Sequence, residues 1–320
     1  MVNQRRPDGS LRHLITLDGL ARPELEKLLQ RAQGYVCLPG SQPRMNQRLA
    51  GITIGNLFTE PSTRTRVSFE LAGRRLGAEV VNLEVQLSSQ MKGETMLDTI
   101  RTLESLHFDM FVIRDSQAGV VAHVADNVAA HVSVLSAGEA HVSHPTQGLL
   151  DALTVLQHKG ERFDRLTLAV VGDIRHSRVA RSAYEAFTGL GIGELRLIAP
   201  EGLMPQPGEF PRGVRFSTPE DGLQGCDIVM MLRIQKERMQ AAAIPDGGDY
   251  FQHFGLDRRR LQLAKPDAIV MHPQPMNRGI EIDDEVADGR QSVIRDQVRN
   301  GVAVRMAVLE QVARPRPLRA

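Results

Sequence analysis

A dense run of hydrogen-bond donors, Ser62-Thr63-Arg64-Thr65-Arg66, lies between a short apolar stretch and an amphipathic one. The apolar stretch predicts a strand over residues 51–58, and the amphipathic one predicts a helix over residues 63–76. Free backbone N–H groups and the positive end of the helix dipole converge at a helix start, and hydroxyl and guanidinium groups add donors suited to a tetrahedral dianion. A lone Ser-Thr pair would favour an ordinary N-cap. Five consecutive donors favour a phosphate site.

Two more polar positions stand where elements meet. Arg114 ends a predicted strand, and His144-Pro145-Thr146-Gln147 comes directly before a long helical stretch. A strand-end arginine is often only solvated, and His144 could be structural with Thr146 as an N-cap. Ligands gather at the carboxyl ends of strands in open α/β sheets, however, so both positions are candidates for a site.

The second half of the chain carries weaker patterns. The turn at Gly172-Asp173 leads to Arg178, but it lacks the G-x-G-x-x-G spacing, which disfavours a nicotinamide site. The mixed charges of residues 233–238 would by themselves suit an exposed loop, and so would the polar residues 88–95. The prolines at 273 and 275 predict a rigid turn in which one X-Pro bond could be cis.

The elements that position these residues alternate between short β-branched runs and amphipathic stretches, which indicates α/β architecture with parallel sheets. The chain has 320 residues, which suits two domains of about 100–200 residues each. We expect two doubly wound parallel-sheet domains joined by interdomain helices, over residues 1–145 and 146–291, with a C-terminal helix in 292–320 packing back on the first. The expected strands cover residues 51–58, 78–83, 109–113, 132–136, 166–171, 194–198, 227–232 and 268–271. The expected helices cover residues 63–76, 95–106, 118–129, 146–158 and 292–312.

Composition excludes several classes. The formal charge is only +1, so no broad basic surface is available for nucleic acid. Two cysteines far apart in the sequence suggest neither a disulfide framework nor a zinc site. No apolar run reaches the roughly 18 residues of a membrane span. We expect a soluble, cytoplasmic protein.

Residues 58–66, Phe-Thr-Glu-Pro-Ser-Thr-Arg-Thr-Arg, closely resemble the carbamoyl-phosphate motif of the aspartate and ornithine carbamoyltransferases, and the resemblance extends over almost the whole chain. Residues 233–238 and the turn at 271–279 resemble the aspartate branch, while the ornithine branch's Asp-containing Ser-Met and His-Cys-Leu-Pro motifs do not occur. The resemblance implies a transferase that uses carbamoyl phosphate and L-aspartate to make N-carbamoyl-L-aspartate and phosphate in pyrimidine (UMP) biosynthesis. It implies no cofactor and no metal.

The resemblance also implies roles for individual residues. Those expected to act in catalysis are Arg64, Thr65, Arg114 and His144. Those expected to bind carbamoyl phosphate are Ser62, Thr63, Arg64, Thr65, Ser88, Arg114, His144, Gln147, Gln274 and Pro275, the last two through main-chain oxygen. Those expected to bind aspartate are Lys92, Arg178, Arg233 and Gln235. The leaving phosphate can accept the amine proton, so no dedicated protein base is expected.

Ser88 and Lys92 match residues that reach a neighbouring subunit's site in the family, which implies a homotrimer with shared active sites. Residues 276–282 resemble members that associate with dihydroorotase-like chains, whereas other members bind regulatory chains. Asp115 stands where His was expected, and a carboxylate there could partly neutralise the site; Gln274 replaces Gly or Leu. The alternatives are a carbamoyltransferase for ornithine or another amine, a non-catalytic scaffold of this fold, and a nucleotide-binding dehydrogenase.

Overall fold

The computed structural model describes residues 3–83, 95–234 and 247–313. These residues form two compact units. The first unit comprises Met1–Gly19, Glu26–Thr146 and Arg299–Ala320, and the second comprises Leu20–Leu25 and Gln147–Val298. The division between them falls inside three helices, namely α1 (Arg22–Gln33), α6 (Pro145–Lys159) and α13 (Ile294–Val312).

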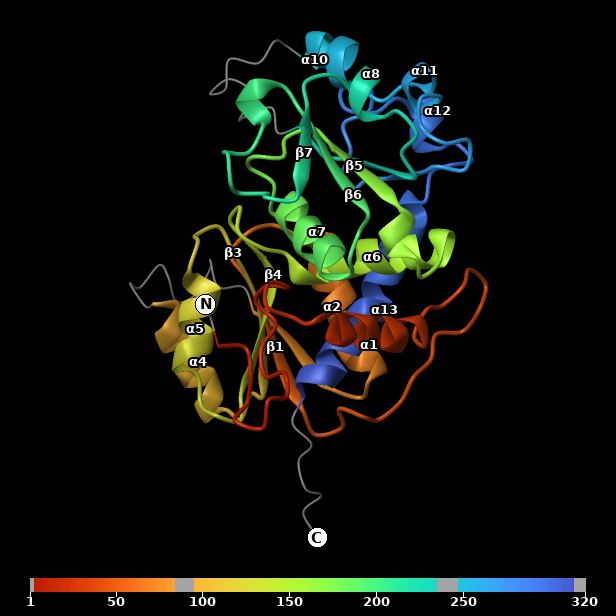
Figure 1. The fold of residues 1–320 in the computed structure, drawn as a ribbon. Helices are drawn as coiled ribbons and strands as arrows, with labels where there is room; N and C mark the ends of the chain where they lie inside the picture. The colour runs from red at the N-terminus through yellow and green to blue at the C-terminus, as the bar shows by residue number, and fades with distance from the viewer. Residues whose placement is uncertain (1–2, 84–94, 235–246, 314–320) are drawn as a thin grey trace. The chain divides into compact units, whose positions relative to one another are not determined.

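The first unit contains a four-stranded parallel sheet in the order β2-β1-β3-β4 (Figure 1). Its strands are β1 (Thr53–Phe58), β2 (Glu79–Leu83), β3 (Met110–Asp115) and β4 (Ser133–Glu139), and its other helices are α2 (Thr63–Arg75), α4 (Met96–Ser105) and α5 (Val120–Asn127). The strand order reverses at β1, because β2 lies on one side of it and β3 on the other. Such a reversal opens a crevice at the carboxyl ends of the two central strands.

The two faces of this sheet are covered by different helices (Figure 1). Ile100 of α4 and Val124 of α5 pack with Leu57, Phe111 and other buried residues in one apolar cluster. On the opposite face α2 approaches closely enough that a Cβ on Gly73 would stand 2.6 Å from the side chain of Val80. A glycine is therefore required where this helix crosses the sheet.

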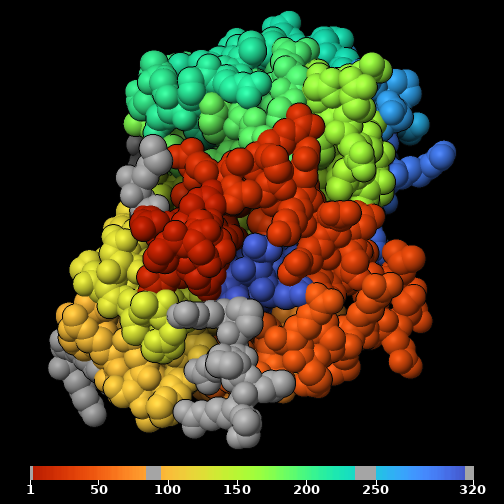
Figure 2. Space-filling model, turned by 60° about the horizontal axis from the view of Figure 1, so that its bottom comes forward, coloured from red at the N-terminus to blue at the C-terminus, as the bar shows by residue number. Residues whose placement is uncertain are grey.

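The two ends of the chain meet in the first unit. The guanidinium of Arg6 donates to the backbone oxygen of Val312 at 2.6 Å, and the hydroxyl of Ser133 donates to the same oxygen at 2.9 Å. Figure 2 shows the N-terminal segment in red beside the C-terminal helix in blue. These bonds satisfy a carbonyl at the end of α13 that has no partner within the helix.

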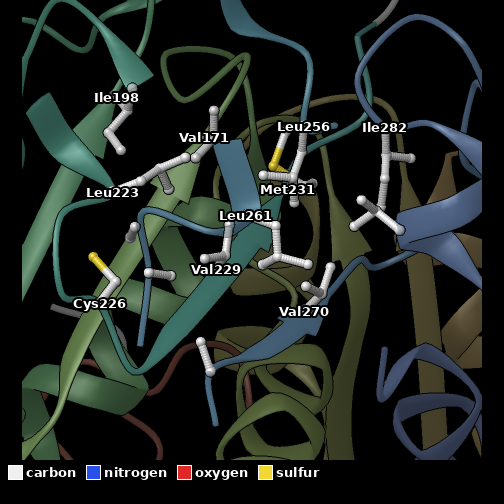
Figure 3. Packing of buried hydrophobic residues seen from close by; sticks show 14 of the residues in the cluster. Val171, Ile198, Leu223, Cys226, Val229, Met231, Leu256, Leu261, Val270 and Ile282 are labelled. Atoms are coloured by element: carbon white, nitrogen blue, oxygen red, sulfur yellow. The ribbon is translucent and has the colours of Figure 1, made fainter. Parts of the chain in front are cut away.

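The second unit contains a five-stranded parallel sheet in the order β7-β6-β5-β8-β9. Its strands are β5 (Thr167–Val171), β6 (Glu194–Ile198), β7 (Gly213–Phe216), β8 (Ile228–Met231) and β9 (Ile269–Met271). Its remaining helices are η2 (Phe163–Arg165), α7 (Arg178–Gly189), η3 (Glu201–Leu203), α8 (Pro219–Gly222), α10 (Gly247–Phe254), α11 (Arg258–Leu261) and α12 (Asp284–Ala287). Alternate residues of the strands, such as Val171, Val229 and Val270, pack against Leu256, Ile282 and their neighbours (Figure 3).

The predicted fold class, two parallel α/β sheets, is confirmed. Sequence reasoning missed α1, β7 and four short helices of the second unit, α8, α10, α11 and α12. Helix α1 does carry a detectable pattern, because Leu25, Leu28 and Leu29 are buried at helical spacing. Strand β7 is a four-residue edge strand whose central residues are exposed, so it lacks an apolar pattern. None of the helices within the described ranges is both long and apolar enough to cross a membrane.

Candidate active site

The donor run lies at the point where the first sheet's order reverses. Phe58 and Arg114 are register partners at the carboxyl ends of β1 and β3. The pairing continues one residue further, because Thr59 N donates to Arg114 O at 3.0 Å. The structure therefore brings Arg114 beside the segment that leads into Ser62–Arg66, although the two are far apart in the sequence.

Helix α2 begins at Thr63, directly after Ser62. The Ser62 side chain makes no cap hydrogen bond, and the first turn contains no acidic residue. Thr63 and Arg64 are exposed, whereas Thr65 is buried. An ordinary Ser N-cap is thus not what the structure shows. The uncapped N–H groups and the positive end of the helix dipole suit an anion.

Arg114 contacts both neighbouring segments at this edge of the sheet. Its Nη1 donates to Ala137 O of β4 at 3.2 Å, and its Nη2 lies 3.1 Å from Glu60 Oε2. Asp115 does not pair with it, since the Asp115 carboxylate accepts from the Thr59 hydroxyl at 3.1 Å and from Gln117 N at 2.8 Å. The carboxylate that partly neutralises Arg114 is therefore Glu60, which sequence reasoning did not single out.

A second cation lies buried under α2. Arg305 of α13 is 4% exposed, and its guanidinium carbon lies 5.0 Å from the centroid of the Phe69 ring. Its buried Nε has no hydrogen-bond partner, and the guanidinium forms no ion pair with any residue in the described part of the chain. Burial, with the nearby charge of Arg114, lowers the pKa of Arg305 to about 9. Phe69 is one turn after Thr65 on the buried face of α2, so this charge adds positive potential beneath the donor run.

His144 belongs to the same unit and follows β4, the neighbour of β3. The chain turns back after β4, because Glu139 N donates to Ser143 O at 2.9 Å, and this turn returns His144 toward the strand end. His144 is 5% exposed and directly precedes α6. The first unit thus gathers most of the predicted carbamoyl-phosphate residues around the ends of β1, β3 and β4: Ser62, Thr63, Arg64, Thr65, Arg114 and His144.

The second sheet also reverses its order, between β5 and β8, and two predicted residues follow these strands. Arg178 is the first residue of α7, whose N-cap Ser177 accepts from Ala180 N at 3.1 Å. Arg233 is exposed two residues after the end of β8. Gly172 has φ of +126°, and a Cβ there would stand 2.9 Å from Leu232 O, so only glycine permits this close approach.

The turn after β9 holds the predicted Gln274 and Pro275. The peptide bond between them is cis, as the sequence allowed, and Gln274 has φ of +55°. Gln274 N donates to His272 Nδ1 at 2.8 Å, and His272 Nε2 lies 3.2 Å from Glu281 Oε1. The turn is therefore held by a buried pair, since His272 and Glu281 are 1% and 0% exposed.

Gln147 belongs to the second unit and donates from Nε2 to Asp151 Oδ1 at 3.0 Å. Asp151 was not predicted, although its position four residues later on α6 could have been noticed.

The predicted Ser88, Lys92 and Gln235 lie outside the described residues. Among the residues described, no group of three or more potential ligands could hold a metal ion.

Comparison with known proteins supports one family over both units. Residues 12–157 match the carbamoyl-phosphate-binding domain of the aspartate/ornithine carbamoyltransferases, and residues 164–312 match their aspartate/ornithine-binding domain. An aspartate transcarbamoylase from Trypanosoma cruzi, solved with carbamoyl phosphate and aspartate, is 30% identical with a TM-score of 0.83; the match covers 95% of this chain and 97% of that chain.

Ornithine carbamoyltransferases match to a comparable degree. The enzyme from Thermus thermophilus is 25% identical with a TM-score of 0.82, covering 95% of this chain and 99% of that one. The enzyme from Pyrococcus furiosus is 29% identical with a TM-score of 0.82, covering 94% and 96%. The chain therefore belongs to the aspartate/ornithine carbamoyltransferase family, and it is a carbamoyltransferase.

Proposed function

We propose that this carbamoyltransferase uses L-aspartate as its acceptor and makes N-carbamoyl-L-aspartate and phosphate in the cytoplasmic synthesis of pyrimidines. The observation that carries the proposal is the placement of Arg178 and Arg233 after the two central strands of the second sheet. Two guanidinium groups suit the two carboxylates of aspartate and would repel the side-chain ammonium of ornithine. The Trypanosoma cruzi enzyme, solved with carbamoyl phosphate and aspartate, is consistent with this acceptor.

In the proposed mechanism the first unit binds carbamoyl phosphate. The phosphate is held at the start of α2 by Ser62, Thr63, Arg64 and Thr65. Ser88 and Lys92 reach the same phosphate from a neighbouring subunit of a homotrimer. Arg114 and His144, with Thr65, stabilise the negative charge that develops on the carbonyl oxygen as the amine attacks. The departing phosphate accepts the amine proton, so the protein acts mainly by placement and electrostatics.

The second unit binds the acceptor in this proposal. The two carboxylates are held by Arg178, Arg233 and Gln235, together with Lys92 from the neighbouring subunit. The carbamoyl nitrogen is oriented by Gln147 and by the main-chain carbonyls of Gln274 and Pro275. Glu60 pairs with Arg114 at 3.1 Å. Substrate oxygen must compete with this carboxylate for the guanidinium, which is a reason for Arg114 to change partner on binding.

The decisive assay offers carbamoyl phosphate with L-aspartate or with L-ornithine and measures the ureido product. Two charge-assisted bonds of about 2 kcal/mol each favour aspartate by about a thousandfold in kcat/KM. A preference for ornithine would refute the assignment of Arg178 and Arg233, and no transfer to any amine would favour a non-catalytic scaffold.

Arg233→Ala provides the matched mutational test. We expect KM for aspartate to rise by at least tenfold, with the KM for carbamoyl phosphate nearly unchanged, because only a carboxylate contact is removed. Arg215→Ala is the control, since Arg215 lies on the edge strand β7 with its side chain 39% exposed. Equal effects of the two substitutions would show that Arg233 has no specific contact with aspartate. Native mass measured on the same samples tests the homotrimer and reveals any copurifying dihydroorotase-like or regulatory chain.

A further inference from the structure

A chain of buried polar groups runs through the second unit behind Gln147. Asp151 is 0% exposed and its Oδ1 accepts two hydrogen bonds, from Gln147 Nε2 at 3.0 Å and from Gln297 Nε2 at 2.7 Å. The Gln297 side-chain oxygen accepts from His272 N at 2.9 Å. Three distant segments, α6, the first turn of α13 and the turn after β9, are therefore joined through Gln297.

The directions of these bonds determine how each amide is oriented. Gln297 donates to a carboxylate oxygen and accepts from a backbone N–H, so exchanging its oxygen and nitrogen would break both bonds. Gln147 turns its nitrogen toward Asp151 Oδ1, which accepts in both protonation states, as a carboxylate oxygen or as the carbonyl oxygen of a carboxyl protonated on Oδ2. Gln147 keeps its Oε1 and the second hydrogen of Nε2 for other partners, and no residue in the described ranges donates to that oxygen.

The chain continues beyond His272 toward the residues after β8. Glu281 pairs with His272 Nε2, accepts from Asn277 N, and accepts from Ile234 N at 3.5 Å. Asn277 Nδ2 donates to Ile234 O at 2.8 Å. Ile234 directly follows Arg233, so one buried network connects Gln147, the turn of Gln274 and the backbone beside Arg233.

We propose that Asp151 is a positioning residue that holds the Gln147 amide with its oxygen available to accept from the –NH2 of a carbamoyl group, and that Gln297 ties this pair to the turn after β9. A reversed Gln147 would present N–H donors to the N–H donors of the ligand. The inference rests on the role of Gln147 in the proposed function, and it adds the residues that make that role selective for an amide nitrogen.

The test measures binding of phosphonoacetamide, a stable carbamoyl phosphate analogue with CH2 in place of the bridging oxygen, by calorimetry on the full chain. It needs no acceptor amine, so it is independent of the choice between aspartate and ornithine. We expect Gln147→Ala and Asp151→Leu each to weaken binding about tenfold, as for loss of one neutral hydrogen bond. The double variant should bind like Gln147→Ala alone, because Asp151 acts only through Gln147.

Two further variants separate positioning from stability. Asp151→Asn keeps an oxygen acceptor for both glutamines and should retain affinity within about threefold of the wild type. Thr154→Val removes a buried hydrogen bond from the same helix, the one from its hydroxyl to Leu150 O at 2.7 Å, and should lower the melting temperature without weakening binding. If Asp151→Leu does not fold, Gln297→Met replaces it, with the same expectation of weaker binding that is not additive with Gln147→Ala.

Each contrary result has a distinct meaning. Weakening by Gln147→Ala but not by Asp151→Leu, or by Gln297→Met where it replaces that variant, overturns the inference and leaves the proposed role of Gln147 intact. A double variant that loses the product of the two single effects shows that Asp151 acts independently of Gln147, which also overturns it. Unchanged binding by Gln147→Ala removes the proposed role of Gln147, and this inference with it.

Discussion

Asp151 should make the stability of this protein depend on pH in a direction opposite to that of most carboxylates. Complete burial raises the pKa of Asp151 from the ordinary 3.8 to about 7, although the hydrogen bonds from Gln297 and Gln147 act the other way. A carboxyl whose pKa is higher in the folded state binds more protons there than in the unfolded chain at intermediate pH. Its contribution to stability is therefore fully present below about pH 4 and is lost as the pH rises toward 7 and above.

The size of the effect follows from these two values. A difference of about 3 pH units, at 1.36 kcal/mol per unit, corresponds to about 4 kcal/mol over the whole range. Between pH 5 and pH 8 the calculated loss is about 3 kcal/mol. If the second unit, which holds Asp151, melts as one cooperative domain, that is roughly 6–12 °C in its melting temperature, at about 2–4 °C per kcal/mol for a domain of this size.

Asp151→Asn isolates this contribution, because the amide is nearly isosteric and does not titrate. Scanning calorimetry of both proteins from pH 5 to pH 8 removes the effects of all other groups by subtraction. We expect the variant to gain stability relative to the wild type as the pH rises from 5 to 7, and the gain to level off above pH 7. A difference in melting temperature that stays constant between pH 5 and pH 8 would refute both the burial argument and its sign.

Three further outcomes can be checked directly. Arg64→Ala should lower kcat by about 10²–10³, because its donors face charge that builds as phosphate leaves, and near wild-type kcat at saturating substrate would exclude that role. Arg305→Met should raise the melting temperature, because it removes a buried charge that has no ion-pair partner in the described structure. The same change should weaken binding of inorganic phosphate, because it removes positive potential beneath the donor run. A lower melting temperature would contradict the first expectation. Cys226 is fully buried and burial raises its pKa to about 11, so a thiol reagent should label only Cys37 in the native chain, and rapid labelling of both would show that Cys226 is accessible.

Local pattern alone was enough to predict the two parallel α/β sheets and most of their elements. The expected strand over residues 194–198 coincides with β6, and the helix expected from residue 63 begins there. This success has a physical reason, because β-branched runs and helical periodicity are properties of neighbouring residues. The donor run of residues 62–66 and the family resemblance were likewise visible without coordinates.

The tertiary structure decided which charges meet. Glu60, and not the neighbouring Asp115, pairs with Arg114, because register places the end of β1 beside β3. Asp151 contacts Gln297 across 146 positions of sequence, which no local pattern encodes. Spacing on a helix can propose that Gln147 and Asp151 are neighbours. Only the packing of α13 and the turn after β9 around them determines that the pair is buried, oriented and connected to the rest of the site.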